Sequence, residues 1–159
     1  MDPSPELEAF LRLEFEFTKQ PDPVAPSLRT KRRVSLLLLI LAKSYGRRLT
    51  WKGLQLINWA LRDPRNMDLL VRLNSGTDIP DLPILRIEPA MDRAVDLALG
   101  LGYISQTDGR VFQLTAEGSG LAAEIERTSA FAREKEQLAR LKGKITQTQI
   151  NRFLEWRAR

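Results

Sequence analysis

Few residues in this chain have the types and spacing that catalytic chemistry requires. The sequence contains no cysteine and no histidine, which excludes zinc sites built on thiolate or imidazole and nucleophiles activated by histidine. The best remaining pair is Asp92 and Asp96, which share one face of an expected helix. Two carboxylates at this spacing can hold a metal ion or exchange a proton with a substrate. No third ligand lies near them in the sequence, so the pair does not indicate a site.

Two glycine-rich stretches have the composition of phosphate-binding loops but not their context. Gly100-Leu101-Gly102 precedes an expected strand, whereas a phosphate loop follows one. Gly118-Ser119-Gly120 lies within a helix start and lacks the lysine of a P-loop. The sequence therefore predicts a protein that is not an enzyme, with no catalytic residue, no cofactor-binding residue and no metal site.

The positive charge of the chain is concentrated in one segment. The formal net charge is +5, yet residues 28–53 carry eight basic groups and no acid. Such a segment can contact nucleic-acid phosphates or an acidic protein surface. The alternative is a solvated rim around a buried helix. The candidate DNA-backbone or acidic-partner contacts are Arg29, Lys31, Arg32, Arg33, Arg47, Arg48 and Lys52.

The elements that would position these groups are clearest in Ala98–Arg127. An apolar helix ends there at a glycine, and two short strands follow at Tyr103–Gln106 and Val111–Leu114, with a turn at Asp108-Gly109. Thr115 can cap the next helix. The order helix–strand–turn–strand–helix is typical of a winged helix-turn-helix, which binds nucleic acid or protein. We therefore expect a mainly α fold with a small β-wing, an α+β domain.

Turn and cap residues divide the rest of the chain into further elements and three regions. The helices expected before the wing are residues 28–45, Trp51–Arg62 capped by Thr50, a third opened by Asp63 and Pro64, and a fourth restarting at Glu88-Pro89 after an irregular connector at Thr77–Ile87. The predicted regions are an N-terminal arm with a strand (1–27), a winged-helix domain (28–127) and a C-terminal helical extension (128–159).

The helix before the wing stands where a DNA-binding winged helix places its recognition helix. Its expected outward residues are Glu88, Asp92, Arg93, Asp96 and Leu97, three acids and one base. Phosphate repels such a face, and carboxylates pair with few base edges. Sequence-specific DNA readout by this helix is therefore disfavoured, which leaves protein docking as the favoured use of the fold.

The two ends of the chain carry apolar residues beyond the needs of one small core. In the arm, apolar and charged side chains alternate with the period of a strand, which could pair with the chain's own sheet or with a partner's sheet. The helix from Thr115 is expected to run to about Leu141, and Phe131, Leu138 and Ile145 recur at the spacing of a short coiled-coil seam. Thr146 and Gln149 form a capping box for a final exposed helix. The candidate partner interface is Leu11, Leu13, Phe15, Phe17, Phe153 and Trp156.

Several of these stretches together resemble a known family. They are the leucine-rich first helix, Leu56–Arg62, Glu88–Ala94, and Phe112–Thr115 with Gly118, which lie between about residues 34 and 125. They are similar to the small middle-component proteins of bacterial ABC-type three-component systems, the group that includes Lamassu antiphage systems. The arm and the final helix have no place in this resemblance.

The resemblance implies a non-catalytic accessory subunit. Such a protein would dock on an SMC-like ABC ATPase and link it to an effector subunit, often a nuclease, in defence against phage or plasmid DNA, with non-specific DNA contact possible within the complex. The alternative is a winged-helix transcription regulator that dimerises through the helix from Thr115, and a third reading is a module that binds the DNA backbone through the basic segment. The acidic start and the short apolar run Val34–Ala42 predict a cytoplasmic protein without membrane contact.

Overall fold

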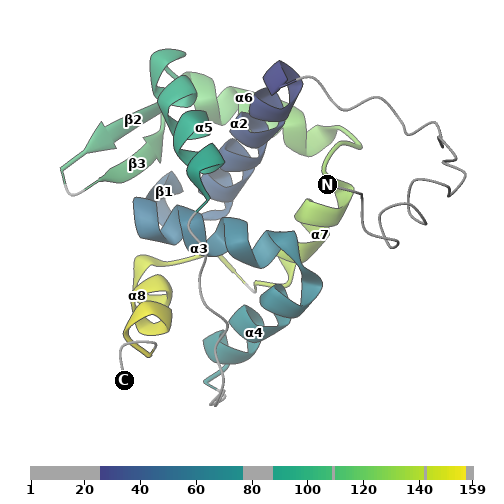
Figure 1. Ribbon diagram of the computed structural model, residues 1–159, viewed down its shortest axis with the longest axis vertical. Coiled ribbons are helices and arrows are strands. Elements are labelled where there is room, and N and C mark those ends of the chain that lie inside the picture. The colour runs from purple at the N-terminus through teal and green to yellow at the C-terminus, as the bar shows by residue number, and fades with distance from the viewer. Residues whose placement is uncertain (1–25, 77–87, 109, 142, 157–159) are drawn as a thin grey trace, which may run out of the picture.

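The computed structural model describes residues 26–76, 88–108, 110–141 and 143–156. The predicted arm strand and the connector Thr77–Ile87 lie outside these residues. The described part is mostly helical with one small antiparallel sheet (Figure 1). Its elements are α2 (Pro26–Lys43), the 3₁₀ turn η1 (Tyr45–Arg47), β1 (Arg48–Thr50), α3 (Trp51–Arg62), α4 (Pro64–Asn74), α5 (Pro89–Gly100), β2 (Ile104–Thr107), β3 (Val111–Leu114), α6 (Ala116–Arg127), α7 (Ala132–Ala139) and α8 (Gln147–Trp156).

Helix α2 is the centre of the core. Its leucine-rich segment is buried on almost every side, as the unbroken apolar run predicts. Helices α5 and α6 pack against it, and α3 runs below it in the view of Figure 1. The first two helical turns of α2 carry four cations, and a fifth, Lys43, is its last residue.

The sheet has the strand order β1-β3-β2, and both pairings are antiparallel. Leu49 of β1 lies opposite Phe112 of β3, and both side chains are buried against the core. The β2–β3 hairpin projects from the helical body (Figure 1). Strand β1 was not predicted, because three residues are too few to show a period of two.

Three helix starts use the caps that the sequence predicts. The Thr50 hydroxyl accepts from the Gly53 N–H at 3.2 Å, and the Thr115 hydroxyl accepts from the Gly118 N–H at 3.1 Å. At α8, the Thr146 N–H donates to the Gln149 side chain at 2.8 Å and the Gln149 N–H donates back to Thr146 at 3.3 Å. The helix starts at Trp51, Ala116 and Gln147 are thus confirmed.

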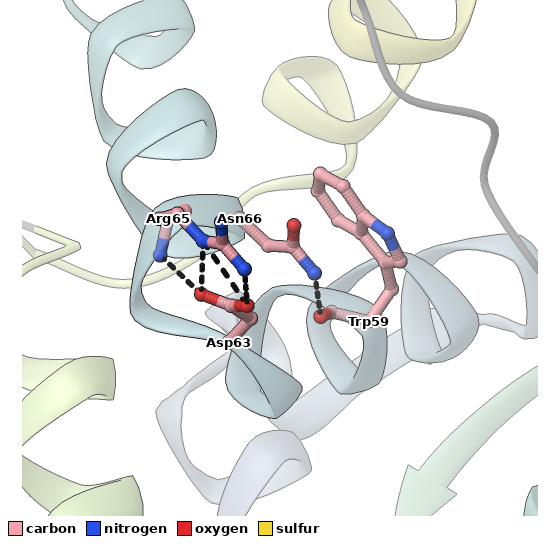
Figure 2. Close-up of polar contacts among 4 residues, drawn as sticks. All are labelled: Trp59, Asp63, Arg65 and Asn66. Atoms are coloured by element: carbon pink, nitrogen blue, oxygen red, sulfur yellow. Dashed lines mark hydrogen bonds and ion pairs between the residues drawn. The ribbon is translucent and has the colours of Figure 1, made fainter.

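The corner between α3 and α4 is also capped, and Figure 2 shows its contacts. Asp63 Oδ1 accepts from the Arg65 N–H at 2.9 Å, while the Arg65 guanidinium donates to Asp63 Oδ2 at 2.8 Å. The Arg65 side chain is the main reason that the pKa of Asp63 falls from 3.8 to about 2. Asn66 Nδ2 donates to the Trp59 carbonyl at 3.0 Å and so ties α4 back to α3.

The single long helix expected from Thr115 to Leu141 is wrong. Helix α6 ends at Arg127, and the Lys135 ammonium donates to three carbonyls there, those of Ile125, Glu126 and Thr128. Phe131 then has a left-handed backbone (φ 60°) before α7 begins. The coiled-coil seam is therefore interrupted, and Leu138 and Ile145 are buried in the chain's own core.

The C-terminal part is fastened to the end of α2. Ile145 N–H donates to the Lys43 carbonyl at 3.2 Å, and Tyr45 N–H donates to the Ile145 carbonyl at 2.8 Å. This bridge brings α8 against α3 and α4. Among the described helices, none combines the length and the apolar composition that crossing a membrane requires.

Candidate interaction surfaces

Helix α5 is positioned by polar side chains of α3 that the sequence analysis did not single out. Gln55 and Asn58 are 1% and 6% exposed although both are polar. Gln55 exchanges hydrogen bonds with the backbone of Glu88 at 3.1 and 3.4 Å, and Asn58 donates to the Glu88 carboxylate at 2.8 Å. Arg33 of α2 forms a salt bridge to the same carboxylate at 2.7 Å. Gln55 and Asn58 could have been found from the sequence, because they are polar residues within a helix that is otherwise broadly apolar.

Trp51 connects α5 with the hairpin. Its indole Nε1 donates to Asp92 at 2.6 Å, and its backbone N–H donates to the Arg110 carbonyl at 2.9 Å. The Arg110 guanidinium lies over the indole ring, 5.2 Å from its centroid. Helix α5 and the turn of the hairpin are thus held to the same residue at the start of α3.

These contacts correct the expected charge of the outward face of α5. Glu88 and Asp92 are half-buried acceptors, and one oxygen of Asp92 is occupied by the Trp51 indole. Arg93 and Asp96 remain exposed and balance each other in formal charge. The sequence could not show that two of these acids have internal partners. Arg33 offsets the charge of Glu88, whereas the neutral indole of Trp51 leaves Asp92 charged, so the face keeps a small acidic excess.

Helix α5 also exposes two large apolar side chains. Leu97 is 38% exposed, and Leu101, at the end of the helix, is 50% exposed. Positions four residues apart lie on one helix face, so the two leucines form one ridge. We call Leu97 and Leu101 the α5 ridge. Tyr45 is the only other large apolar side chain with comparable exposure in the described part, at 68%.

The basic segment does not form one face. Its first group stands on the opening turns of α2 and its second group at η1, β1 and the start of α3, so 10 to 14 residues of α2, roughly 15–21 Å, separate them. In the first group, Arg32 pairs with Glu134 and lies over the Phe131 ring, while Arg33 pairs with Glu88. The expected single face around the Gly46 turn is therefore wrong.

The cations of the second group are not neutralised by acidic side chains in the part of the chain that the structure describes. Arg47 donates to the Ser119 hydroxyl at 3.0 Å, and Arg48 lies opposite Gln113 on the sheet. Together with Lys52 and Arg110 these side chains form what we call the hairpin-side cations. None of the four has a salt bridge within the ranges that the structure describes. Arg47 and Arg110 also have a positive φ, 55° and 57°, which is uncommon for residues other than glycine.

The C-terminal candidates differ from their prediction. Phe153 was expected on an exposed surface, but it is 4% exposed and packs its ring against Trp59 with centroids 6.0 Å apart. The expectation is wrong because α8 turns its apolar side toward α3 and α4. Nothing is described of the Trp156 side chain, and Leu11, Leu13, Phe15 and Phe17 lie outside the described residues.

A cavity lies beside Phe153. It has a volume of about 150 Å³ and is bounded by α3, α4, α8 and the segment before α8. The walls are mainly apolar, and Lys144 and Arg152 are among the residues that line it. The cavity could not be predicted from the sequence, because its residues come from four separate segments.

Comparisons of the chain with the models of known protein families, with curated proteins and with solved structures found no match. The surfaces of the chain itself must therefore indicate its function. They are the α5 ridge, the hairpin-side cations and the cavity between α4 and α8.

Proposed function

We propose that this chain is a non-catalytic docking subunit with a winged-helix fold, which joins an SMC-like ABC ATPase to an effector nuclease in defence against phage or plasmid DNA. The observation that carries the docking role is the α5 ridge. Adjoining apolar side chains on a rigid element can anchor a protein partner. A helix that reads DNA presents donors there instead.

The order of the elements supports the winged-helix part of the proposal. Helix α2, strand β1 and helix α3 precede α5, and the β2–β3 hairpin follows with β3 between the other two strands. Helix α4 is then an insertion between α3 and α5. The choice of an ABC ATPase and an effector as partners rests on the resemblance given in the sequence analysis.

Co-expression with the products of the neighbouring genes tests the proposal. We expect the wild-type chain to co-purify with an ATPase, and Leu97→Glu with Leu101→Glu to lower the retained ATPase by about tenfold or more, because apolar anchors dominate interface energies. The control is Tyr45→Glu, which places a carboxylate on the other large exposed apolar residue and should retain the ATPase. Absence of any stable complex, or equal loss in the control, would contradict the proposal.

One observation favours a second function, direct contact with DNA in the manner of a winged-helix transcription regulator. The hairpin-side cations have no acidic partner in the described residues. The logarithm of the DNA association constant falls with the logarithm of the salt concentration, by about 0.9 per phosphate contact on duplex DNA. If Arg47 and Arg48 bind phosphates, replacing both with Gln should make this dependence less steep by about 2. A transcription regulator additionally requires selective binding to its own promoter.

The opposite end of α2 supplies the control for this measurement. Arg29→Gln with Lys31→Gln removes the same charge from exposed positions of the first group. An unchanged slope in this control and a reduced slope in the Arg47/Arg48 variant would place DNA at the hairpin side. Equal slopes in both variants would reject a localised contact.

A further inference from the structure

The cavity between α4 and α8 has the size of one large side chain. Its apolar walls include Ile57 of α3, Leu70 and Leu73 of α4, and Ile150 and Phe153 of α8. Its volume of about 150 Å³ matches cavities that hold a single benzene ring. Pockets that enclose a whole small-molecule ligand usually measure about 300–1,000 Å³. The cavity therefore suits one apolar side chain of a polypeptide better than a complete ligand.

The border of the cavity is positively charged. Lys144 and Arg152 are exposed, and neither has a salt bridge or a hydrogen bond from its side chain within the part of the chain that the structure describes. The described lining contains no aspartate or glutamate. A segment that carries acidic residues next to an apolar anchor would therefore complement this site in charge as well as in shape.

We infer that the occupant of the cavity is the chain's own N-terminal arm. The arm has six acidic and two basic residues over positions 1–27. Phe15 and Phe17 each follow a glutamate, so an anchor and a carboxylate are adjacent at both positions. The two halves of the candidate partner interface, the arm and Phe153, then contact each other. The inference is independent of the ATPase proposed above, since it concerns two parts of one chain.

The connection to α2 allows the arm to reach the cavity. Ile145, which lines the cavity, is hydrogen-bonded to the C-terminal end of α2, while the arm joins the N-terminal end at Pro26. The straight-line distance to be covered is therefore at least about the length of α2, 18 residues or roughly 27 Å, and the path over the surface is longer. Glu16 is ten residues before Pro26, which can span about 33 Å when extended.

The absence of cysteine from the sequence makes a cross-linking test unambiguous. In the full chain, Glu16→Cys is combined with Thr148→Cys, an exposed position at the cavity. The control combines Glu16→Cys with Thr107→Cys, an exposed position on the hairpin. We expect disulfide formation to be at least about tenfold faster with Thr148→Cys, because preorganised contact raises the effective concentration. Similar rates in the two pairs would overturn the inference.

Gel mobility separates a link within one chain, which the inference requires, from a link between two copies, which would contradict it. Phe15→Ser with Phe17→Ser should abolish the preference for Thr148→Cys. If the disulfide with Thr148→Cys still forms faster in this variant, Phe15 and Phe17 do not anchor the arm in the cavity. Lys144→Glu with Arg152→Glu should slow the link by about two- to fivefold, as expected for exposed ion pairs. Adding Glu14→Lys to that variant should restore the rate, and failure of the restoration would contradict the charge complementarity.

Discussion

Helix α3 has a different kind of neighbour on each of its two sides. Toward the sheet, Trp51, Gln55 and Asn58 hold α5 and the hairpin through directed hydrogen bonds. On its other side, α4 and the C-terminal helix α8 pack on α3 mainly through apolar side chains and leave a cavity of about 150 Å³. We call these the sheet side and the cavity side.

The difference bears on what each side can do. Directed hydrogen bonds fix the orientation of α5, so its ridge is presented in one geometry and a partner need not order it. Apolar packing is less directional and tolerates an unfilled volume, whose lining atoms lack contacts until something enters. The sheet side is thus suited to presenting a surface, and the cavity side to receiving a side chain.

The largest expected effect comes from adding a single methyl group to the sheet side. A Cβ at Gly118, at the start of α6, would lie 1.9 Å from the Tyr103 carbonyl oxygen, which is backbone and cannot move aside cheaply. We expect Gly118→Ala to lower the free energy of unfolding by more than about 4 kcal/mol, among the largest effects of single substitutions. Urea denaturation followed by circular dichroism measures it.

Gly120 in the same helix is the matched control, because a Cβ there meets nothing within 4 Å. Gly120→Ala should raise the free energy of unfolding by about 0.5–1 kcal/mol, since alanine loses less backbone entropy in a helix. Similar stabilities of the two variants would show that the close contact between α6 and Tyr103 does not exist in solution.

On the cavity side, the largest effect should come from Phe153. Its buried ring contacts Trp59 and fixes α8 to α3. Phe153→Ala should cost about 3 kcal/mol, the low end for removal of a buried aromatic ring, because part of the space beside it is already unfilled. Leu154→Ala, at a half-buried position of the same helix, should cost clearly less. A cost below about 1 kcal/mol for Phe153→Ala would mean that α8 detaches without loss of the core.

A smaller effect is expected at Glu88, where a charge is held by partners from two helices. Glu88→Gln removes the salt bridge to Arg33 but keeps an oxygen that can accept from Asn58. We expect a loss of about 1 kcal/mol and faster amide exchange in the first turn of α5. Asp96→Asn changes the same charge at an exposed position of that helix and should stay within about 0.5 kcal/mol. Equal effects would mean that the Glu88 contacts do not orient α5.

The sequence allowed most helix starts to be predicted because their signals are local. Thr50, Asp63, Thr115 and Thr146 each stand directly before a helix and cap it. The break after Arg127 could not be predicted in the same way. It depends on Lys135 folding back to the end of α6, a contact between residues that a continuous helix would keep apart.

The candidate surfaces were less predictable, because they depend on which charged groups find partners. Glu88 and Asp92 look like solvent-facing acids in the helical pattern, yet Asn58 and Trp51 occupy them. Arg32 and Arg47 look like members of one cluster, yet the greater part of α2 lies between them. Leu97 was predicted to face outward and does so, because its position follows from helical periodicity alone.

The smallest expected effect is a pH dependence at the α3–α4 corner. The pKa of Asp63 is lowered from the ordinary aspartate value of 3.8 to about 2, chiefly by the hydrogen bond from the Arg65 side chain. A carboxylate whose pKa is lowered by folding stabilises the folded state above its unfolded pKa and loses this contribution as pH falls through the folded value. The contribution should therefore be complete above about pH 5 and disappear between pH 4 and pH 2.

Asp63→Asn isolates this contribution, because asparagine is an equally good helix cap but carries no charge. The unfolding midpoint of the wild-type chain should exceed that of the variant at pH 5 and converge with it as the pH approaches 2. Since the pair is exposed, the gap should be small and should shrink further at high salt. Arg65→Gln should reduce the same pH dependence, because it removes the main donor while the backbone N–H of residue 65 remains. A gap that stays constant from pH 5 to pH 2 would show that the corner is held by the cap geometry alone. In that case an ion pair would contribute to the free energy of unfolding on the sheet side, through Glu88 and Arg33, but not at the α3–α4 corner of the cavity side.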